Sequence, residues 1–273
     1  MFFESIFMIR GGIFGYDFSV KLLIALFGIT LCYYDWKENE KRLDYFWVFL
    51  IGTLIWSLAE FLLQLVGIRE LQDKFFFGIN ITSCFWFTIP LQGMSEGAFV
   101  ALINLFVGDR LLDKEKRKEG LFVLFGYHII NFGITYSILF SLGYNFLNVN
   151  VGDLSVPSRR DIFTIPSLIY LALFIAPFIY WYIRTNKRLR KRANHMFLLM
   201  LITVSIWTLL EWLTGQRWIE VGIKTSEGTY SNLTRAPPLI EFLALAYDVV
   251  IEIVLMYMPF LAIPYLLGLI KSE

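Results

Sequence analysis

The sequence predicts an all-α integral membrane protein with seven transmembrane helices. Of its 273 residues, 57% are hydrophobic, whereas apolar residues make up about 45–50% of soluble domains. Apolar runs of roughly 20 residues recur along the chain, and a helix of about that length crosses the hydrocarbon core of a bilayer. The net charge of +1 gives no indication of nucleic-acid binding.

Segments with charged residues mark where the predicted spans begin and end. The first two spans are divided by a segment that holds Lys37, Lys41 and Arg42. The third span has the least defined start, because its apolar run already begins at Phe75, and Lys271 follows the last span. The predicted spans cover residues 17–35, 45–67, 85–108, 120–142, 162–183, 196–216 and 245–270.

Basic residues also orient the chain. They concentrate in the first, third and fifth connections, which the positive-inside rule places in the cytoplasm. The C-terminus then lies in the cytoplasm and the N-terminus lies outside. We therefore expect a multi-pass protein, in a membrane that the sequence does not identify.

A similar seven-residue motif occurs in both halves of the chain, each time inside a predicted span. Residues 55–61 read IWSLAEF and residues 206–212 read IWTLLEW, so Glu60 aligns with Glu211. The same shift aligns the basic connections that precede the two spans. This pattern is typical of a parallel internal repeat of three spans, a linker span and three more spans. In a single membrane domain of residues 1–273, repeat A covers residues 17–108, the linker helix 120–142 and repeat B 162–270.

Four glutamates of the predicted spans lie at one depth: Glu60, Glu96, Glu211 and Glu252. At about 1.5 Å per residue, they lie ~20–27 Å from the cytoplasmic ends of their helices. Charged residues within a membrane usually face a cavity and serve a function, although any one of them can simply bond a neighbouring helix. Crowded, buried acids can hold and exchange protons, so we predict catalytic acid–base groups among these four and Asp248.

Further side chains around this layer are predicted to bind a substrate. Trp56 and Trp207 lie one helical turn from the repeated glutamates, and aromatic faces stabilise cations. The other candidates are polar residues of the second, fourth and last spans: Gln64, His128, Asn131 and Glu241. Two histidines and two cysteines form no metal-ligand pattern, so we expect neither a metal nor another cofactor.

The two tryptophans and the segment PLIEF at residues 238–242 resemble motifs of the membrane lycopene cyclase domain family, which uses repeated three-helix units. Glu241 matches one of the four glutamates of that family's motifs. The chain is also similar to the membrane-bound terpene cyclases, which have seven spans and essential acids that Glu60 and Asp248 match. Both families protonate an isoprenoid double bond or epoxide without a cofactor. The resemblance therefore implies acid catalysis on a lipid.

Three function classes stay open. The first is a cyclase or isomerase whose partner is a membrane lipid or a hydrophobic small molecule. The second is a proton-coupled transporter of a small solute, because the sugar transporters of the SWEET and PQ-loop group share the 3+1+3 topology. The third is a non-catalytic membrane subunit whose acids pair with basic residues of another protein.

Overall fold

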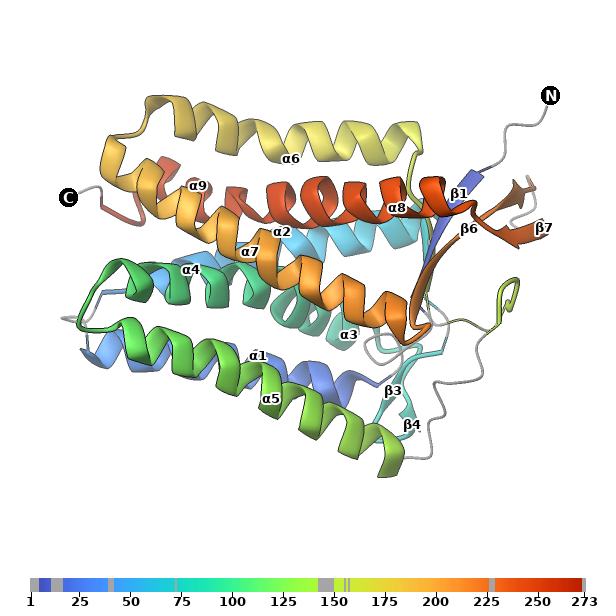
Figure 1. Ribbon diagram of the computed structural model, residues 1–273, viewed down its shortest axis with the longest axis horizontal. Coiled ribbons are helices and arrows are strands. Elements are labelled where there is room, and N and C mark those ends of the chain that lie inside the picture. Colours follow the sequence, from blue (N-terminus) through green and yellow to red (C-terminus); the bar gives the residue numbers. More distant parts are fainter. Residues whose placement is uncertain are drawn as a thin grey trace.

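Helices form most of the protein, and strands gather at one end of them (Figure 1). The computed structural model describes residues 5–10, 17–38, 42–71, 73–141, 150–154, 156, 158–225 and 229–271. We call the end that carries the larger sheet the sheet end, and the other the opposite end. The end of α1 and the start of α2, together with the connections between α4 and α5 and between α6 and α7, lie at the opposite end (Figure 1).

Helices occupy every segment that hydropathy predicts to be helical. Two of the segments change geometry along their length, because a π-helical turn interrupts the α-helix. The continuous helices are α1 (Phe18–Glu38), α2 (Asp44–Leu65), α5 (Arg117–Ser141), α6 (Ile165–Arg184) and α7 (Lys187–Leu213). The interrupted segments are α3 (Phe85–Gly93), η1 (Met94–Ala98) and α4 (Phe99–Leu112), and α8 (Pro238–Tyr247), η3 (Asp248–Leu255) and α9 (Pro259–Leu266).

Five of these helical segments are long and apolar enough to cross a membrane: α1, α2, Phe85–Leu112, α6 and α7. The segment Phe85–Leu112 lies in the middle of the bundle, and 83% of the residues in its most apolar stretch are buried. In α6 and α7, only 17% and 22% of the residues in the corresponding stretch are buried. The outer helices therefore present apolar side chains to their surroundings, as helices in contact with lipid do.

The prediction of an all-helical protein was wrong, because a five-stranded sheet closes one end of the bundle. Its strand order is β2-β5-β1-β6-β7, and a separate hairpin pairs β3 (Phe75–Phe76) with β4 (Ile79–Asn80). The strands lie in the connections between helices, where short polar segments resemble loops. They are β1 (Ser5–Arg10), β2 (Arg69–Leu71), β5 (Ser158–Asp161), β6 (Arg217–Lys224) and β7 (Tyr230–Arg235).

The two faces of this sheet differ, because successive side chains of a strand point to opposite sides. Phe7, Ile9 and Trp218 are buried together on one face. Their neighbours along the chain, Met8 and Arg10, lie on the face that is turned to the helices and line a cavity there. The register is antiparallel throughout, so residues that are paired across strands share a face.

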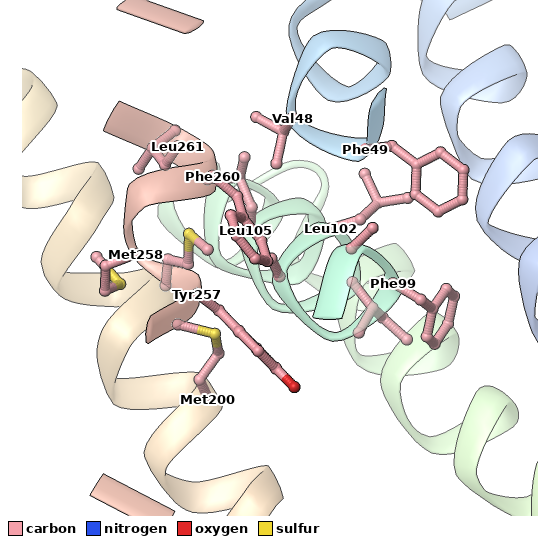
Figure 2. Close-up of a cluster of buried hydrophobic side chains, with 14 of the residues drawn as sticks. Val48, Phe49, Phe99, Leu102, Leu105, Met200, Tyr257, Met258, Phe260 and Leu261 are labelled. Carbon is pink, nitrogen blue, oxygen red and sulfur yellow. The ribbon is translucent and has the colours of Figure 1, made fainter. Parts of the chain in front are cut away.

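The apolar core surrounds α4, which packs against α1, α2, α5 and α7. Figure 2 shows side chains from α2, α4, α7 and the last helical segment meeting in this core. The labelled residues are Val48, Phe49, Phe99, Leu102, Leu105, Met200, Tyr257, Met258, Phe260 and Leu261.

Two glycines bring the third helical segment close to α2. A Cβ atom on Gly93 would lie 2.2 Å from Oγ of Ser57 and 2.7 Å from the carbonyl oxygen of Thr53. A Cβ atom on Gly97 would lie 2.8 Å from the ring of Trp56. Only a residue without a side chain permits this approach, which sets the position of η1 beside α2.

We expect Gly93→Ala to lower the free energy of unfolding by about 1–3 kcal/mol, because the added methyl group overpacks the contact between α2 and α3. Gly126→Ala on α5 is the matched control. Its Cβ atom would meet nothing within 4 Å, and alanine favours a helix by up to ~1 kcal/mol over glycine. Unfolding of both variants in detergent measures the difference. Equal stability of the two variants would contradict the close packing.

Candidate functional site

A cavity of about 150 Å³ lies between the sheet and the helices. Side chains from β1, β2, β5 and β6 form its ceiling, and side chains from α1, α2, α4, α5, α7 and η3 form its walls. Aromatic and aliphatic groups alternate with charged ones. The aromatic members are Trp56, Phe99, Tyr127, Trp207 and Tyr257.

The first polar cluster beside the cavity joins the glutamate of α2 to that of η1. Nη1 of Arg69 lies 2.7 Å from Oε2 of Glu60, and its Nη2 lies 3.6 Å from Oε2 of Glu96. Lys21 of α1 donates to Glu96 at 2.7 Å. Gln64 donates to Glu60 from one turn along α2. All four charged groups are mostly removed from solvent, with Glu60 at 0% exposure.

The second polar cluster joins the glutamate of α7 to acids of η3. Nη2 of Arg217 lies 2.6 Å from Oε2 of Glu211, and its Nη1 lies 2.7 Å from Oδ2 of Asp248. A single nitrogen of Arg160, Nη2, donates to Asp248 at 2.9 Å and to Glu252 at 2.5 Å. Asp248 and Glu252 are thus two carboxylates that share one donor.

The clusters have the same plan. Arg69 and Arg217 are each the first residue of the strand that follows a glutamate-bearing helix. Each arginine uses Nη1 and Nη2 to bridge that glutamate to an acid in a π-helical turn. In each, the buried Nε has no hydrogen-bond partner among the described residues.

Arg10 is the fourth arginine of the cavity, beside Arg69, Arg160 and Arg217. It is opposite Arg217 in the pairing of β1 with β6 and opposite Ser158 in the pairing of β1 with β5. Burial disfavours its charged form, but the field of acids around it, led by Glu211, outweighs burial and raises the pKa of the guanidinium. Among the described residues, no side chain is within ion-pair or hydrogen-bond distance of the Arg10 guanidinium.

The structure brings most of the predicted site residues to this region. Six of them line the cavity: Trp56, Glu96, His128, Trp207, Asp248 and Glu252. Glu60 and Glu211 lie behind the arginines that they bind, and Trp207 donates its indole N–H to Glu211.

Two predicted substrate-binding residues, Gln64 and Glu241, do not line the cavity. Gln64 reaches the site only through Glu60. Glu241 pairs with Arg235 of β7 at 3.0 Å, away from the cavity. The side chain of Asn131 lies outside the described part of the chain.

The basic residues of the site were missed from the sequence. The four arginines lie just outside predicted spans, where they resemble interfacial residues. Lys21 offered the clearest signal, because a lysine inside a predicted span requires an acidic partner. Within the described residues, no group of three or more His, Cys, Asp and Glu side chains is placed to hold a metal ion.

No protein-family model, curated protein or solved structure matches this chain. The chemistry of the cavity is therefore the basis for assigning a function.

We expect Arg217→Met to lower the free energy of unfolding by about 3–5 kcal/mol, because it leaves Glu211 and Asp248 buried without their shared partner. Arg235→Met is the matched control on the same sheet. Arg235 also pairs with a glutamate, but its side chain is 48% exposed, so its loss should cost less than about 1 kcal/mol. Denaturation in detergent measures the free energy of unfolding of the two variants. A similar loss in both variants would show that burial does not set the strength of these pairs.

Proposed function

We propose that the chain is an integral membrane protein that crosses the bilayer seven times, with the sheet end outside and the opposite end in the cytoplasm. The five long apolar helices support this topology, and α5 together with α8–η3–α9 would complete it. The basic connections between α4 and α5 and between α6 and α7 lie at the opposite end (Figure 1), as the positive-inside rule requires of a cytoplasmic side.

A parallel 3+1+3 repeat is part of the same proposal. The helical order α1, α2, α3–η1–α4 would correspond to α6, α7, α8–η3–α9, with α5 as the linker. A π-helical turn that carries an acid interrupts the third segment of each half. The arginine that binds this acid begins the strand after the second helix in both halves.

The proposed activity is cofactor-independent acid–base catalysis on an isoprenoid or another lipid, as a cyclase or an isomerase. The observation that carries it is the carboxylate pair of Asp248 and Glu252 at the cavity wall, where both accept from Nη2 of Arg160. Two carboxylates this close repel each other unless one holds a proton. Such a pair can donate a proton and accept one back.

In the proposed reaction, the acid of the pair adds its proton to a carbon–carbon double bond or an epoxide. A carbocation forms on the substrate, rearranges or closes a ring, and then loses a proton to the carboxylate. No electron leaves or enters the substrate overall. Trp56 and Tyr257 meet edge to face at 5.1 Å beside the cavity, and their π faces would stabilise the cation.

The substrate would enter from the lipid side. Tyr127 and His128 of α5, together with Thr203 and Trp207 of α7, line the cavity on the two sides of α4. All four side chains are partly exposed. An entry between α5 and α7 would let a hydrophobic molecule reach the carboxylates without crossing water.

A transporter with the same topology is the second candidate, because each proposed half holds one of the two ion-pair clusters. Alternating access would require the halves to rock against each other. The sheet argues against this motion at the sheet end, because it joins β2 of one proposed half to β5, β6 and β7 of the other.

The proposed orientation predicts which cysteines an impermeant maleimide reaches in intact protoplasts. Cys84 is exposed and precedes α3 at the sheet end, so it should be labelled without lysis. In a Cys84→Ser background, Lys187→Cys at the start of α7 should be labelled only after lysis. The buried Cys32 should stay unlabelled in both. The reverse pattern at Cys84 and position 187 would refute the orientation.

The proposed catalysis predicts that Glu252→Gln lowers product formation by about 10²-fold or more, the usual contribution of a general acid. Glu241→Gln is the matched control, because Glu241 lies in the same helical segment but outside the cavity. Mass spectrometry of lipid extracts identifies the product as the species that appears with the wild-type chain. Equal product from wild type and Glu252→Gln at equal expression would exclude this carboxylate as the acid.

A further inference from the structure

The ceiling of the cavity is a row of arginines on one face of the sheet. In the strand register, Arg69 of β2 lies opposite Arg160 of β5, and Arg10 of β1 lies opposite Arg217 of β6. Each of the four neighbouring strands thus contributes one guanidinium to the same cavity. Adjacent strands lie about 4.8 Å apart, so the four groups form a compact cationic surface.

Several donors of this surface have no acceptor in the part of the chain that the structure describes. Nε of Arg69 and Nε of Arg217 are buried without a hydrogen-bond partner there, and the two side chains are only 8% and 1% exposed. Nε1 of Trp56 is in the same condition, and Trp56 also lines the cavity. Arg10 lies between them, with no hydrogen bond or ion pair to the described residues. A buried donor without an acceptor costs about 1–3 kcal/mol. Arg10 lines the cavity with its donors unoccupied by the described residues, so it is suited to a ligand that accepts.

The donors that remain in the cavity wall also favour an anion. The lining holds four guanidinium groups and three carboxylates, those of Glu96, Asp248 and Glu252, and Lys21, Glu60 and Glu211 behind the lining bring the charges to five basic and five acidic groups. The carboxylates already accept from Lys21 or from the arginines. A cationic ligand would have to displace these pairs, whereas an anion would use the donors that remain.

Apolar side chains make up most of the lining outside the charged groups, beside uncharged polar residues such as Asn104 and Thr203. Below the arginines, Ile24, Phe99, Ile103 and Val204 line the walls. A free inorganic anion would leave this part unused. A molecule with an anionic head and an apolar body fits both parts.

We propose that the cavity recognises an amphiphile with a phosphate-type headgroup, which Arg10 binds together with Arg69 and Arg217. This inference rests on the proposed function, because it names the class of lipid on which the cavity acts. The forked donors of arginine match the oxygens of a phosphate in pairs. The apolar chain lies along the helices, toward the proposed entry between α5 and α7.

Calorimetric titration of the purified full chain in detergent tests the proposal with three probes: hexyl phosphate, hexanol and inorganic phosphate. We expect hexyl phosphate to bind at least about tenfold more tightly than either of the others, since a hydrogen bond to a charged group contributes about that factor. This comparison needs no variant, so it does not depend on whether a mutant folds.

Arg10→Gln tests the headgroup site without breaking an ion pair, because the Arg10 guanidinium has none with the described residues. We expect it to weaken hexyl phosphate at least tenfold and to leave hexanol unchanged. Arg10→Lys keeps the positive charge but loses the forked donors of the guanidinium. Its affinity for hexyl phosphate should lie between those of Arg10→Gln and wild type. Arg235→Gln, on β7 and outside the cavity, is the matched control and should bind hexyl phosphate as wild type does.

The outcomes separate this inference from the proposed function. Binding of hexanol as tight as that of hexyl phosphate would overturn the headgroup site and leave a lipid-binding cavity. Inorganic phosphate that binds as tightly as hexyl phosphate would overturn the amphiphile and assign the arginines to a free anion. Absence of binding by all three probes would count against both proposals. Unchanged affinity of Arg10→Gln for hexyl phosphate would remove Arg10 from the site.

Discussion

Two buried arginines tie the sheet to the helices. Arg69 and Arg217 each begin a strand and each bridge carboxylates of two helical segments. An ion that leaves water loses several kcal/mol of solvation even after the protein relaxes, so each of these charges is tolerable only beside its partners. We infer that the pairs specify where the strands lie on the bundle, since a sheet shifted by one residue would turn the arginines to its other face.

The π-helical turns η1 and η3 carry the acids of the bundle that these arginines bind. Such a turn inserts an extra residue into an α-helix and occurs frequently at functional sites. Glu96 lies in η1, and Asp248 and Glu252 lie in η3. The sequences of the two turns, MSEGA and DVVIEIVL, have little in common. Their shared π-helical geometry therefore does not come from a shared sequence motif. What they share is an acid that meets an arginine of the sheet, and close packing at Gly97 keeps η1 against α2.

Hydropathy located the helices because each one buries or exposes a long apolar surface. It could not locate the sheet, whose strands are three to eight residues long and pair across most of the chain, as Met8 does with Arg160. The acids of the site stood out because a charge within an apolar run is costly. The arginines did not, because an arginine just beyond such a run is ordinary, and only the register of β1, β5 and β6 turns these residues toward one cavity.

Recognition and catalysis would depend on the same guanidinium groups. Arg160 and Arg217 serve three carboxylates, those of Glu211, Asp248 and Glu252, whereas Arg69 and Lys21 serve two, those of Glu60 and Glu96. The cluster that holds Asp248 and Glu252 is thus less fully neutralised and is the better place for a mobile proton. An anionic headgroup on the arginines would add negative charge beside these carboxylates. The added charge favours a proton on the pair, so a bound headgroup would prepare the acid that the proposed reaction uses.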